Sequence, residues 1–525
     1  MNGTTTAREA GWGRWTWLAL LIFGFVIVGL VLVAATGGVR GSDQYWYVAD
    51  VTTLVRDHTL TTNTVFPVAL LGPDPVLPPP FIHNVLSMYL AAVPAMAVGS
   101  YAGWLVLNVL ATFAAAVLIY QVARTVTSRW AALTCAVLYP ALPVVFWHTV
   151  QPLSEASTSL FAALAIYFLS IAGVRTGRWV ALVGALGLLY LSRESYLPLL
   201  LAAPVWFFFV KVREPGVRAR VALASSLLVA TTAVVVVALA DVAFAADNVR
   251  FSYTRLLHAA VPGSTSNMWF NFDLSPESLA DRLPFDPGLV AGKLGEHLAE
   301  QFVRFDSPAF AVFYWTFNLL AIVAVVMLWR CRHRPRQRRL VIGALGFVAI
   351  HVTTIAIFQN QARYTMPAIP GLLVVLAIAL DEIPFLERRL GRRPTAIVVA
   401  LTIMAIVPLA AFALVSRRDG LDQARVEQAT RVLLDSNIPS SEPLLIAYDG
   451  TPQVFAYAAR PRLIAYLWPT YTDQEITRVR TAFPSHWLLA PAGSALIATL
   501  GPRAGSPSGE VDGVDGRWLL VHLGD

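Results

Sequence analysis

The sequence contains little charge and almost no lysine or cysteine. Charged residues make up 14% and hydrophobic residues 57% of its 525 residues, and the mean hydropathy is +0.62. This composition excludes an ordinary soluble domain and indicates a polytopic membrane protein. Cys135 lies in an apolar run and Cys331 in a basic turn. Their positions predict neither a disulfide nor a metal site.

The chain also lacks the motifs of several enzyme classes. It has no glycine-rich phosphate loop, no His-Glu-x-x-His, no Gly-x-Ser-x-Gly and no Cys-x-x-Cys. Nucleotide hydrolysis, zinc chemistry and serine hydrolysis therefore lack their usual residues. The net charge of +7 comes from arginine-rich turns, with only Lys211 and Lys293 as lysines. Because no basic face is interleaved with stacking aromatics, we expect no nucleic-acid partner.

The basic turns between apolar runs predict the topology. The positive-inside rule puts the turns at 211–220, 330–339 and 388–393 in the cytoplasm. The fold class that follows is a polytopic α-helical membrane protein of about eleven transmembrane helices, with the N-terminus inside and the C-terminus outside. The expected spans are 15–35, 103–123, 131–150, 156–173, 179–192, 196–212, 221–241, 308–329, 340–358, 364–381 and 395–415.

The spans divide the chain into a transmembrane domain, 1–416, and a small extracytoplasmic α/β domain, 417–525. In the latter, short apolar runs alternate with helical patterns. Three parts of the first domain are expected outside the membrane core: the first outer loop 37–80, an interfacial helix at 81–98 and the outer loop 242–307. The helix at 81–98 follows Pro78-Pro79-Pro80, and the alternative that it crosses the membrane stays open.

Polar residues gather at the outer ends of these spans. Ionisable groups at membrane depth are energetically unfavourable and indicate a functional site. Arg193 and Arg363 are the candidates to bind a lipid phosphate, because a guanidinium binds phosphate oxygens bidentately and stays charged. The candidate residues on this face are Asp43, His148, Gln151, Glu155, Arg193, Glu194, Arg363 and Tyr364.

Each candidate also has a purely structural explanation. Arg193 could pair with Glu194 or reach the interface, and Arg363 could anchor its span together with an aromatic belt. His148 could cap a span, and Glu155 could be a favourable charge at a helix N-terminus. Asp43 could be a solvated carboxylate that caps a helix starting at Gln44.

Four segments occur in an order that carries a family resemblance. They are the Asp43 loop with Tyr45, Tyr47 and Ala49; Pro78-Pro79-Pro80 leading to Gly99; Leu191-Ser192-Arg193-Glu194; and Arg363-Tyr364-Thr365-Met366-Pro367-Ala368-Ile369-Pro370. In these segments the chain resembles the GT-C membrane glycosyltransferases that use polyprenyl-phosphate sugars. The protein O-mannosyltransferases and the aminoarabinose transferase of lipid A belong to this group.

The resemblance implies an activity and roles for residues. Asp43 would accept the proton of the acceptor hydroxyl, while Tyr45 and the other candidates would bind the lipid phosphate or sugar. Two departures stand out. Gln44 replaces the second acidic residue of many relatives, and no lysine precedes Pro78. We therefore expect catalysis without a cofactor or metal, although a divalent metal stays an alternative.

The predicted function is transfer of one sugar, mannose or arabinofuranose being the candidates, from polyprenyl phosphate with inversion. The acceptor would be an envelope glycan, lipid or protein on the outer face of a bacterial cytoplasmic membrane. Two alternatives stay open. A transporter or flippase of a lipid-linked glycan would contain inverted repeats, which the sequence does not show. A noncatalytic envelope assembly protein would tolerate replacement of Asp43.

Overall fold

The chain divides into two units. Unit 1 comprises 1–36, 105–243 and 291–416, and unit 2 comprises 37–104, 244–290 and 417–525. The spans expected at 15–35 and 395–415 lie outside the described residues. The computed structural model describes residues 42–59, 61–65, 85–173, 175–213, 216–244, 287–303, 308–357, 361–382, 422–435, 438–439, 441–448, 453–458, 462–469, 471–500, 507–513 and 516–523.

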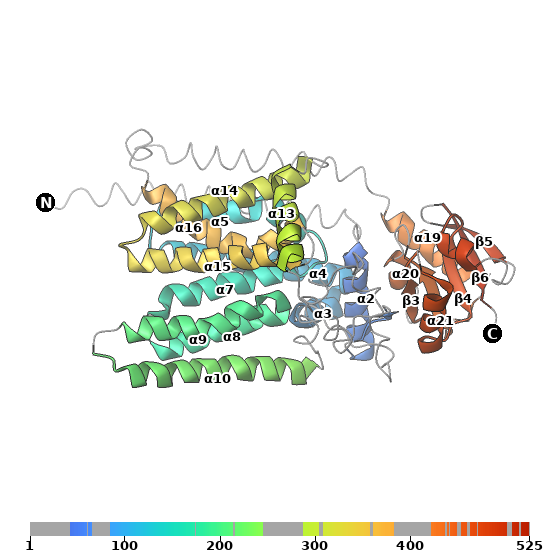
Figure 1. The fold of residues 1–525 in the computed structure, drawn as a ribbon. Coiled ribbons are helices and arrows are strands. Elements are labelled where there is room, and N and C mark those ends of the chain that lie inside the picture. Colours follow the sequence, from blue (N-terminus) through green and yellow to red (C-terminus); the bar gives the residue numbers. More distant parts are fainter. Residues whose placement is uncertain are drawn as a thin grey trace. The chain divides into compact units, whose positions relative to one another are not determined.

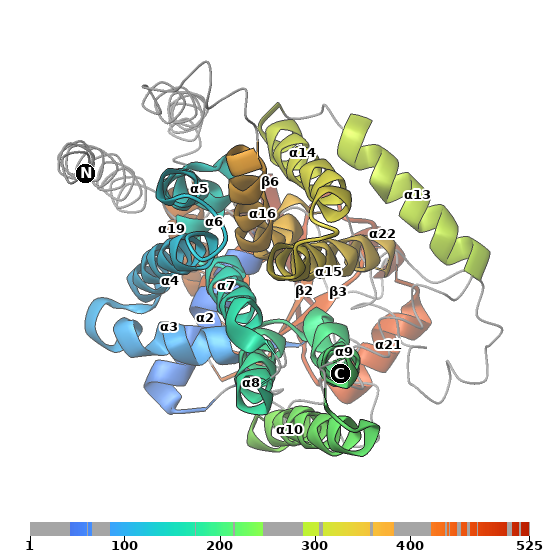
Figure 2. The same cartoon turned by 90° about the vertical axis from the view of Figure 1, so that its left-hand side faces the viewer.

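Unit 1 is a bundle of α-helices. Helices α7 and α8 pack side by side, and α15 and α16 also contact α7, as the view along the bundle shows (Figure 2). The helical elements are α4 (Ser100–Ala123, which begins in unit 2), α5 (Arg129–Ala141), α6 (Pro143–Thr149), α7 (Glu155–Ala172), α8 (Thr176–Ser192), η2 (Glu194–Tyr196), α9 (Leu197–Val212), α10 (Ala219–Phe244), α13 (Pro287–Val303, also shared), α14 (Pro308–Arg330), α15 (Pro335–Ile357), η4 (Ala362–Ala368) and α16 (Ile369–Glu382).

Several of these helices suit a membrane. Within the described residues, five are long and apolar enough to cross one, and the bent pair α5–α6 makes a sixth if it counts as one span. Large apolar side chains stay exposed along them, such as Leu223, Leu227 and Leu239 on α10. Lipid contact accounts for such exposure, which a soluble protein would avoid. The full number of spans and their orientation stay predictions.

The span expected at 131–150 is not one continuous helix. It breaks at Leu142 into α5 and α6, whose axes differ by 52°. Leu142 has φ −65° and ψ 132°, an extended conformation. The residue before a proline avoids the helical region, so Pro143 ends α5, and Pro143 then starts α6 because it needs no N–H donor there.

Unit 2 contains a six-stranded mixed sheet in the order β1-β3-β2-β4-β6-β5. Figure 1 labels its strands β3, β4, β5 and β6, together with the helices α19, α20 and α21 of the same unit. The contacts of β3 with β1, of β2 with β3 and of β2 with β4 are parallel, whereas β6 pairs antiparallel with β4 and β5. Its elements are α2 (Ser42–Asp57), β1 (Thr64–Val65), α3 (Val85–Val98), α19 (Asp422–Asp435), β2 (Leu444–Ala447), α20 (Gln453–Ala458), β3 (Ile464–Leu467), α21 (Asp473–Ala482), β4 (Trp487–Pro491), α22 (Ala495–Leu500), β5 (Pro507–Gly513) and β6 (Gly516–His522).

The edge strand β1 comes from the predicted first outer loop, which the sequence did not connect to the C-terminal domain. Thr64 pairs with Ile464, and the Ile464 N–H donates to the Asn63 carbonyl at 2.8 Å. The Asn63 side chain also donates to the Arg462 carbonyl at 3.3 Å. Thr64 and Val65 of this loop are thus part of the sheet, while the domain boundary at 416/417 stays a prediction.

The expected interfacial segment forms helix α3, which packs on α2 and turns into α4. Gly99 at the turn has φ +86°, a conformation that favours glycine. A Cβ at Gly103 would lie 2.6 Å from the Ala95 Cα, so only glycine allows the two helices this close. Val93 and Met96 of α3 are exposed, as an interfacial helix requires, but its place in a membrane stays a prediction.

Candidate active site

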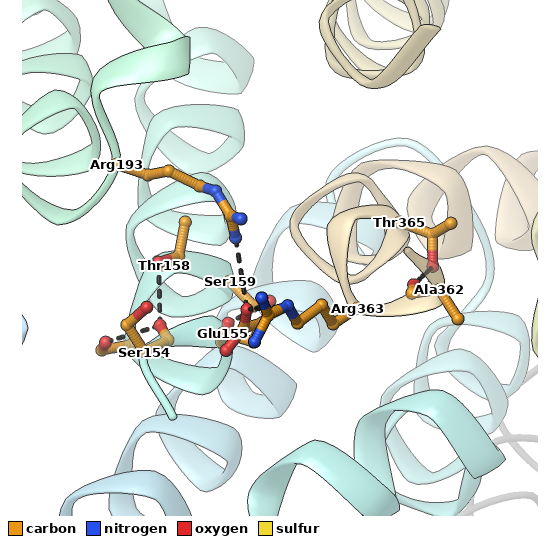
Figure 3. A network of polar contacts seen from close by, with 9 residues as sticks. Ser154, Glu155, Thr158, Ser159, Arg193, Ala362, Arg363 and Thr365 are labelled. Carbon is orange, nitrogen blue, oxygen red and sulfur yellow. Dashed lines mark hydrogen bonds and ion pairs between the residues drawn. The ribbon is translucent and has the colours of Figure 1, made fainter. Parts of the chain in front are cut away.

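Three charged side chains from separate segments of unit 1 meet at Glu155 (Figure 3). Arg193 Nη1 lies 3.3 Å and Arg363 Nε 3.6 Å from Glu155 Oε1. The exposed fractions of the side chains are 3% for Glu155, 15% for Arg193 and 17% for Arg363. These residues and Tyr364 are called the arginine cluster.

The ends of two helices position the first pair. Glu155 is the first residue of α7, where the positive end of the helix dipole favours its carboxylate. Arg193 follows the last residue of α8, and its backbone N–H donates to the carbonyls of Leu189 and Tyr190. Its extended backbone then turns the chain away from the helix axis. The ion pair of Arg193 is therefore with a neighbouring helix.

Arg363 lies in the 3₁₀ segment η4, which begins the expected span 364–381. Pro367 has no N–H to donate to the Arg363 carbonyl, so a regular α-helix cannot form here. The chain instead makes tighter turns, and the Thr365 hydroxyl donates to the Ala362 carbonyl at 2.7 Å. The motif with proline that carried the resemblance is thus the element that positions this guanidinium.

Tyr364 lies beside both guanidinium groups. The Arg193 Cζ is 4.2 Å and the Arg363 Cζ 5.4 Å from the centroid of its ring. An aromatic face attracts a cation at these distances. Tyr364 therefore helps to hold two like charges close together.

The arginine cluster is largely shielded from solvent. Two of its guanidiniums face the carboxylate of Glu155. Glu155 Oε2 is buried, and no hydrogen bond to it occurs within the described residues. A hydroxyl donor on a ligand would satisfy this oxygen, and the two guanidiniums would attract an anionic group of the same ligand.

Two further predicted residues lie close to the cluster. His148, at the end of α6, is buried, interacts electrostatically with Glu155 and packs 6.3 Å from the Phe313 ring, measured between centroids. Gln151 is buried as well, and its carbonyl accepts a hydrogen bond from Asn108 Nδ2 at 2.6 Å. The structure thus brings His148, Gln151 and the arginine cluster into one unit.

The remaining predicted residues have other positions. Asp43 and Tyr45 lie on α2 in unit 2, where Asp43 is partly exposed and Tyr45 is buried. Helix α2 begins at Ser42, so Asp43 belongs to its first turn rather than preceding the helix. Glu194 begins η2, and its side chain is not among those that the structure describes. The role of each residue stays a prediction.

Sequence reasoning missed two buried ionisable residues. Asp50 is 1% exposed and lies two helical turns after Asp43 on the same side of α2. His351 on α15 is 2% exposed, lies 4.6 Å from the Phe317 ring and interacts electrostatically with Arg193. The seven-residue spacing from Asp43 and a histidine within an apolar run were the available signals.

The chain has the GT-C fold, which confirms the resemblance seen in the sequence. A family model described as "Predicted membrane protein (DUF2079)" matches residues 82–280. The apolar helices and this match both place the chain among membrane proteins. No curated protein matches it in sequence.

Two solved structures illustrate the likeness. ArnT from Cupriavidus metallidurans, bound to undecaprenyl phosphate, has 14% identity and a TM-score of 0.57, over 97% of this chain and 98% of ArnT. The oligosaccharyltransferase AglB from Archaeoglobus fulgidus, with an inhibitory peptide and a dolichol-phosphate, has 12% identity and a TM-score of 0.51. That match covers 91% of this chain and 69% of AglB. At such identities the likeness establishes the fold.

Proposed function

We propose that the protein is an inverting glycosyltransferase that takes a sugar from a polyprenyl-phosphate donor. Mannose and arabinofuranose are the candidate sugars, and the acceptor is an envelope glycan, lipid or protein on the outer face of a bacterial cytoplasmic membrane. The observation that carries the proposal is the arginine cluster, where two shielded guanidiniums share one carboxylate in a chain with the GT-C fold.

The arginine cluster suits the phosphate of the donor. When the bond between sugar and phosphate breaks, negative charge develops on the departing lipid phosphate. Arg193 and Arg363 would stabilise this charge, because preorganised donors act strongly where water is excluded. The similar proteins ArnT and AglB carry undecaprenyl phosphate and dolichol-phosphate in their structures, which supports a ligand of this class.

Glu155 has two functions in this proposal. Its Oε1 holds the guanidiniums in place before the donor arrives, so binding needs little rearrangement. Its buried Oε2 accepts a hydrogen bond from a hydroxyl of the donor sugar. The same carboxylate thereby orients the phosphate clamp and the sugar.

Asp43 supplies the base. The acceptor hydroxyl oxygen attacks the anomeric carbon, its proton passes to the Asp43 carboxylate, and the bond to the phosphate oxygen breaks. The lipid phosphate leaves with the bonding electron pair, and the configuration at the anomeric carbon inverts. The phosphate leaving group already activates the donor, so no covalent enzyme intermediate is needed.

A transfer assay tests this proposal. Asp43→Asn should reduce transfer from a labelled polyprenyl-phosphate sugar by about 10²- to 10⁴-fold, the usual effect of removing a general base. The matched control is Asp57→Asn at the other end of α2, where the carboxylate forms an exposed ion pair with Arg56 at 2.5 Å. Undiminished transfer by Asp43→Asn would refute the proposed role.

A topology map tests the location. Cys135 and Cys331 are the two native cysteines, and both are buried. Replacing both gives a cysteine-free protein, into which a single cysteine is introduced at position 43 or in the 440–525 segment. We expect a membrane-impermeant reagent to label both positions from outside intact spheroplasts. Labelling only after lysis would place them in the cytoplasm and exclude an outward-facing site.

A further inference from the structure

Unit 2 contains a group of aromatic side chains beside the helix that carries Asp43. Tyr466 lies in β3, Tyr448 and Trp468 directly follow β2 and β3, and Trp46 lies on α2. Ring centroids are 5.8 Å apart for Tyr448 and Trp468, 5.4 Å for Tyr448 and Tyr466, and 6.3 Å for Trp46 and Tyr466. These four residues are called the aromatic cluster.

The strand register explains why these rings meet. Strands β2 and β3 are parallel with Ala447 opposite Leu467, and the Tyr448 N–H continues the ladder by donating to the Leu467 carbonyl at 2.7 Å. Tyr448 and Trp468 are therefore direct neighbours, and Trp468 shares a sheet face with Tyr466 because alternate residues point the same way. They lie at the carboxyl ends of parallel strands, where α/β sheets commonly bind ligands.

The four residues of the aromatic cluster differ in how deeply they are buried. Tyr466 is completely buried, and burial raises the pKa of its phenol, which keeps it neutral. Tyr448, Trp468 and Trp46 are only partly buried. These three residues therefore keep part of their surface accessible to solvent.

The position of α2 connects this surface to the proposed base. Asp43 precedes Trp46 by three residues on the helix, a spacing that places their Cβ atoms about 5 to 6 Å apart. Trp46 contacts Tyr466, so its side of α2 faces the sheet, and Asp43 lies one helical turn before Trp46. A molecule held against the aromatic cluster would thus extend toward the Asp43 carboxylate.

We propose that the aromatic cluster binds a sugar ring of the acceptor, so that the acceptor is a glycan. This inference rests on the proposed glycosyl transfer. One face of a sugar ring presents C–H groups that pack against aromatic rings, while its hydroxyls point outward to polar groups at the edge. The partly buried rings of Tyr448 and Trp468 supply the apolar surface, and Asp43 takes the proton of the reacting hydroxyl.

Binding measured without a donor tests the inference. Saturation-transfer NMR on the full-length protein in detergent would use three probes: a short mannose oligosaccharide, a short arabinofuranose oligosaccharide and an uncharged Ser-containing peptide. We expect an oligosaccharide to bind and Trp468→Leu to weaken that binding at least tenfold. The matched control is Trp487→Leu, a partly buried tryptophan of β4 in the same sheet.

The variants and the transfer assay separate the outcomes. Trp468→Leu should keep the melting temperature of Trp487→Leu, so a loss of binding cannot be a loss of folding. Three results would overturn the inference: only the peptide binds, no probe binds, or an oligosaccharide binds Trp468→Leu as tightly as it binds the parent. If the parent still transfers sugar when one of these results is found, the proposed function stands and only the inference fails. If a glycan binds but no sugar is transferred, the proposed function fails.

Discussion

Replacing Glu155 by Gln should have opposite effects on protein stability and on the response to a lipid phosphate. The substitution keeps the shape of the side chain and removes one negative charge from beside Arg193 and Arg363. At 3.3 and 3.6 Å and an effective dielectric constant of about 20, Coulomb's law gives about 5 kcal/mol for each lost attraction. The cost of desolvating these charges on folding offsets part of the two attractions. We therefore expect Glu155→Gln to lower the free energy of unfolding by about 3 to 5 kcal/mol.

A bound phosphate should restore much of this loss. Its negative charge neutralises the two guanidiniums that Glu155→Gln leaves without their carboxylate, and a repulsive charge near the phosphate is gone. Undecaprenyl phosphate should therefore raise the melting temperature of Glu155→Gln more than that of the parent, since ligand binding to the folded state adds to its stability. Arg193→Gln should bind this lipid about 10- to 150-fold more weakly, because a hydrogen bond to a charged group contributes about 1.5 to 3 kcal/mol.

The assay is thermal unfolding in detergent with and without undecaprenyl phosphate. Glu382→Gln is the matched control, because Glu382 pairs with Arg334 at a more exposed position. It should respond to the lipid as the parent does. An equal lipid response of Glu155→Gln and the parent, or full stabilisation of Arg193→Gln by the lipid, would refute the assignment of the phosphate to the arginine cluster.

Two further predictions concern packing and metal dependence. Gly103→Leu should lower the free energy of unfolding by about 1 to 3 kcal/mol in a thermal unfolding assay, because the new Cβ would lie 2.6 Å from the Ala95 Cα. Gly184→Ala is the control and should not lower the free energy of unfolding, because its added Cβ has nothing within 4 Å. Equal effects of the two substitutions would contradict the packing argument. EDTA should leave sugar transfer unchanged. Gln44, next to Asp43, has an uncharged amide, whereas a site for a divalent cation favours a second carboxylate at this position. Activity lost to EDTA and restored by a divalent cation would refute that prediction.

Much of the helical architecture was predictable from the sequence. Apolar runs with arginine-rich turns specify membrane helices, because lipid requires an internally hydrogen-bonded backbone. The described spans match α4, α7, α8, α9, α10, α14, α15 and α16 closely. The break at Leu142 was also encoded, since a residue before proline avoids helix, but the apolar pattern continues across it and concealed the bend.

The partners of the site residues were not predictable in the same way. The sequence singled out Arg193 and Arg363 as ionisable groups in apolar surroundings, and it offered Glu194 as the obvious partner of Arg193. The structure pairs both arginines with Glu155, which lies 38 residues before Arg193. Which side chains meet depends on how helix ends pack, and sequence spacing gives no measure of that.

By itself the sequence determined that the chain has the composition of a membrane protein, where its apolar helices lie and which arginines have apolar surroundings, because these follow from composition and from local preferences of the backbone. Only the tertiary structure decided that two arginines share one carboxylate, that Thr64 pairs with Ile464 in the C-terminal sheet, and that Trp46 meets Tyr466. These contacts join residues far apart in the chain, and they form only because packing brings whole helices and strands together.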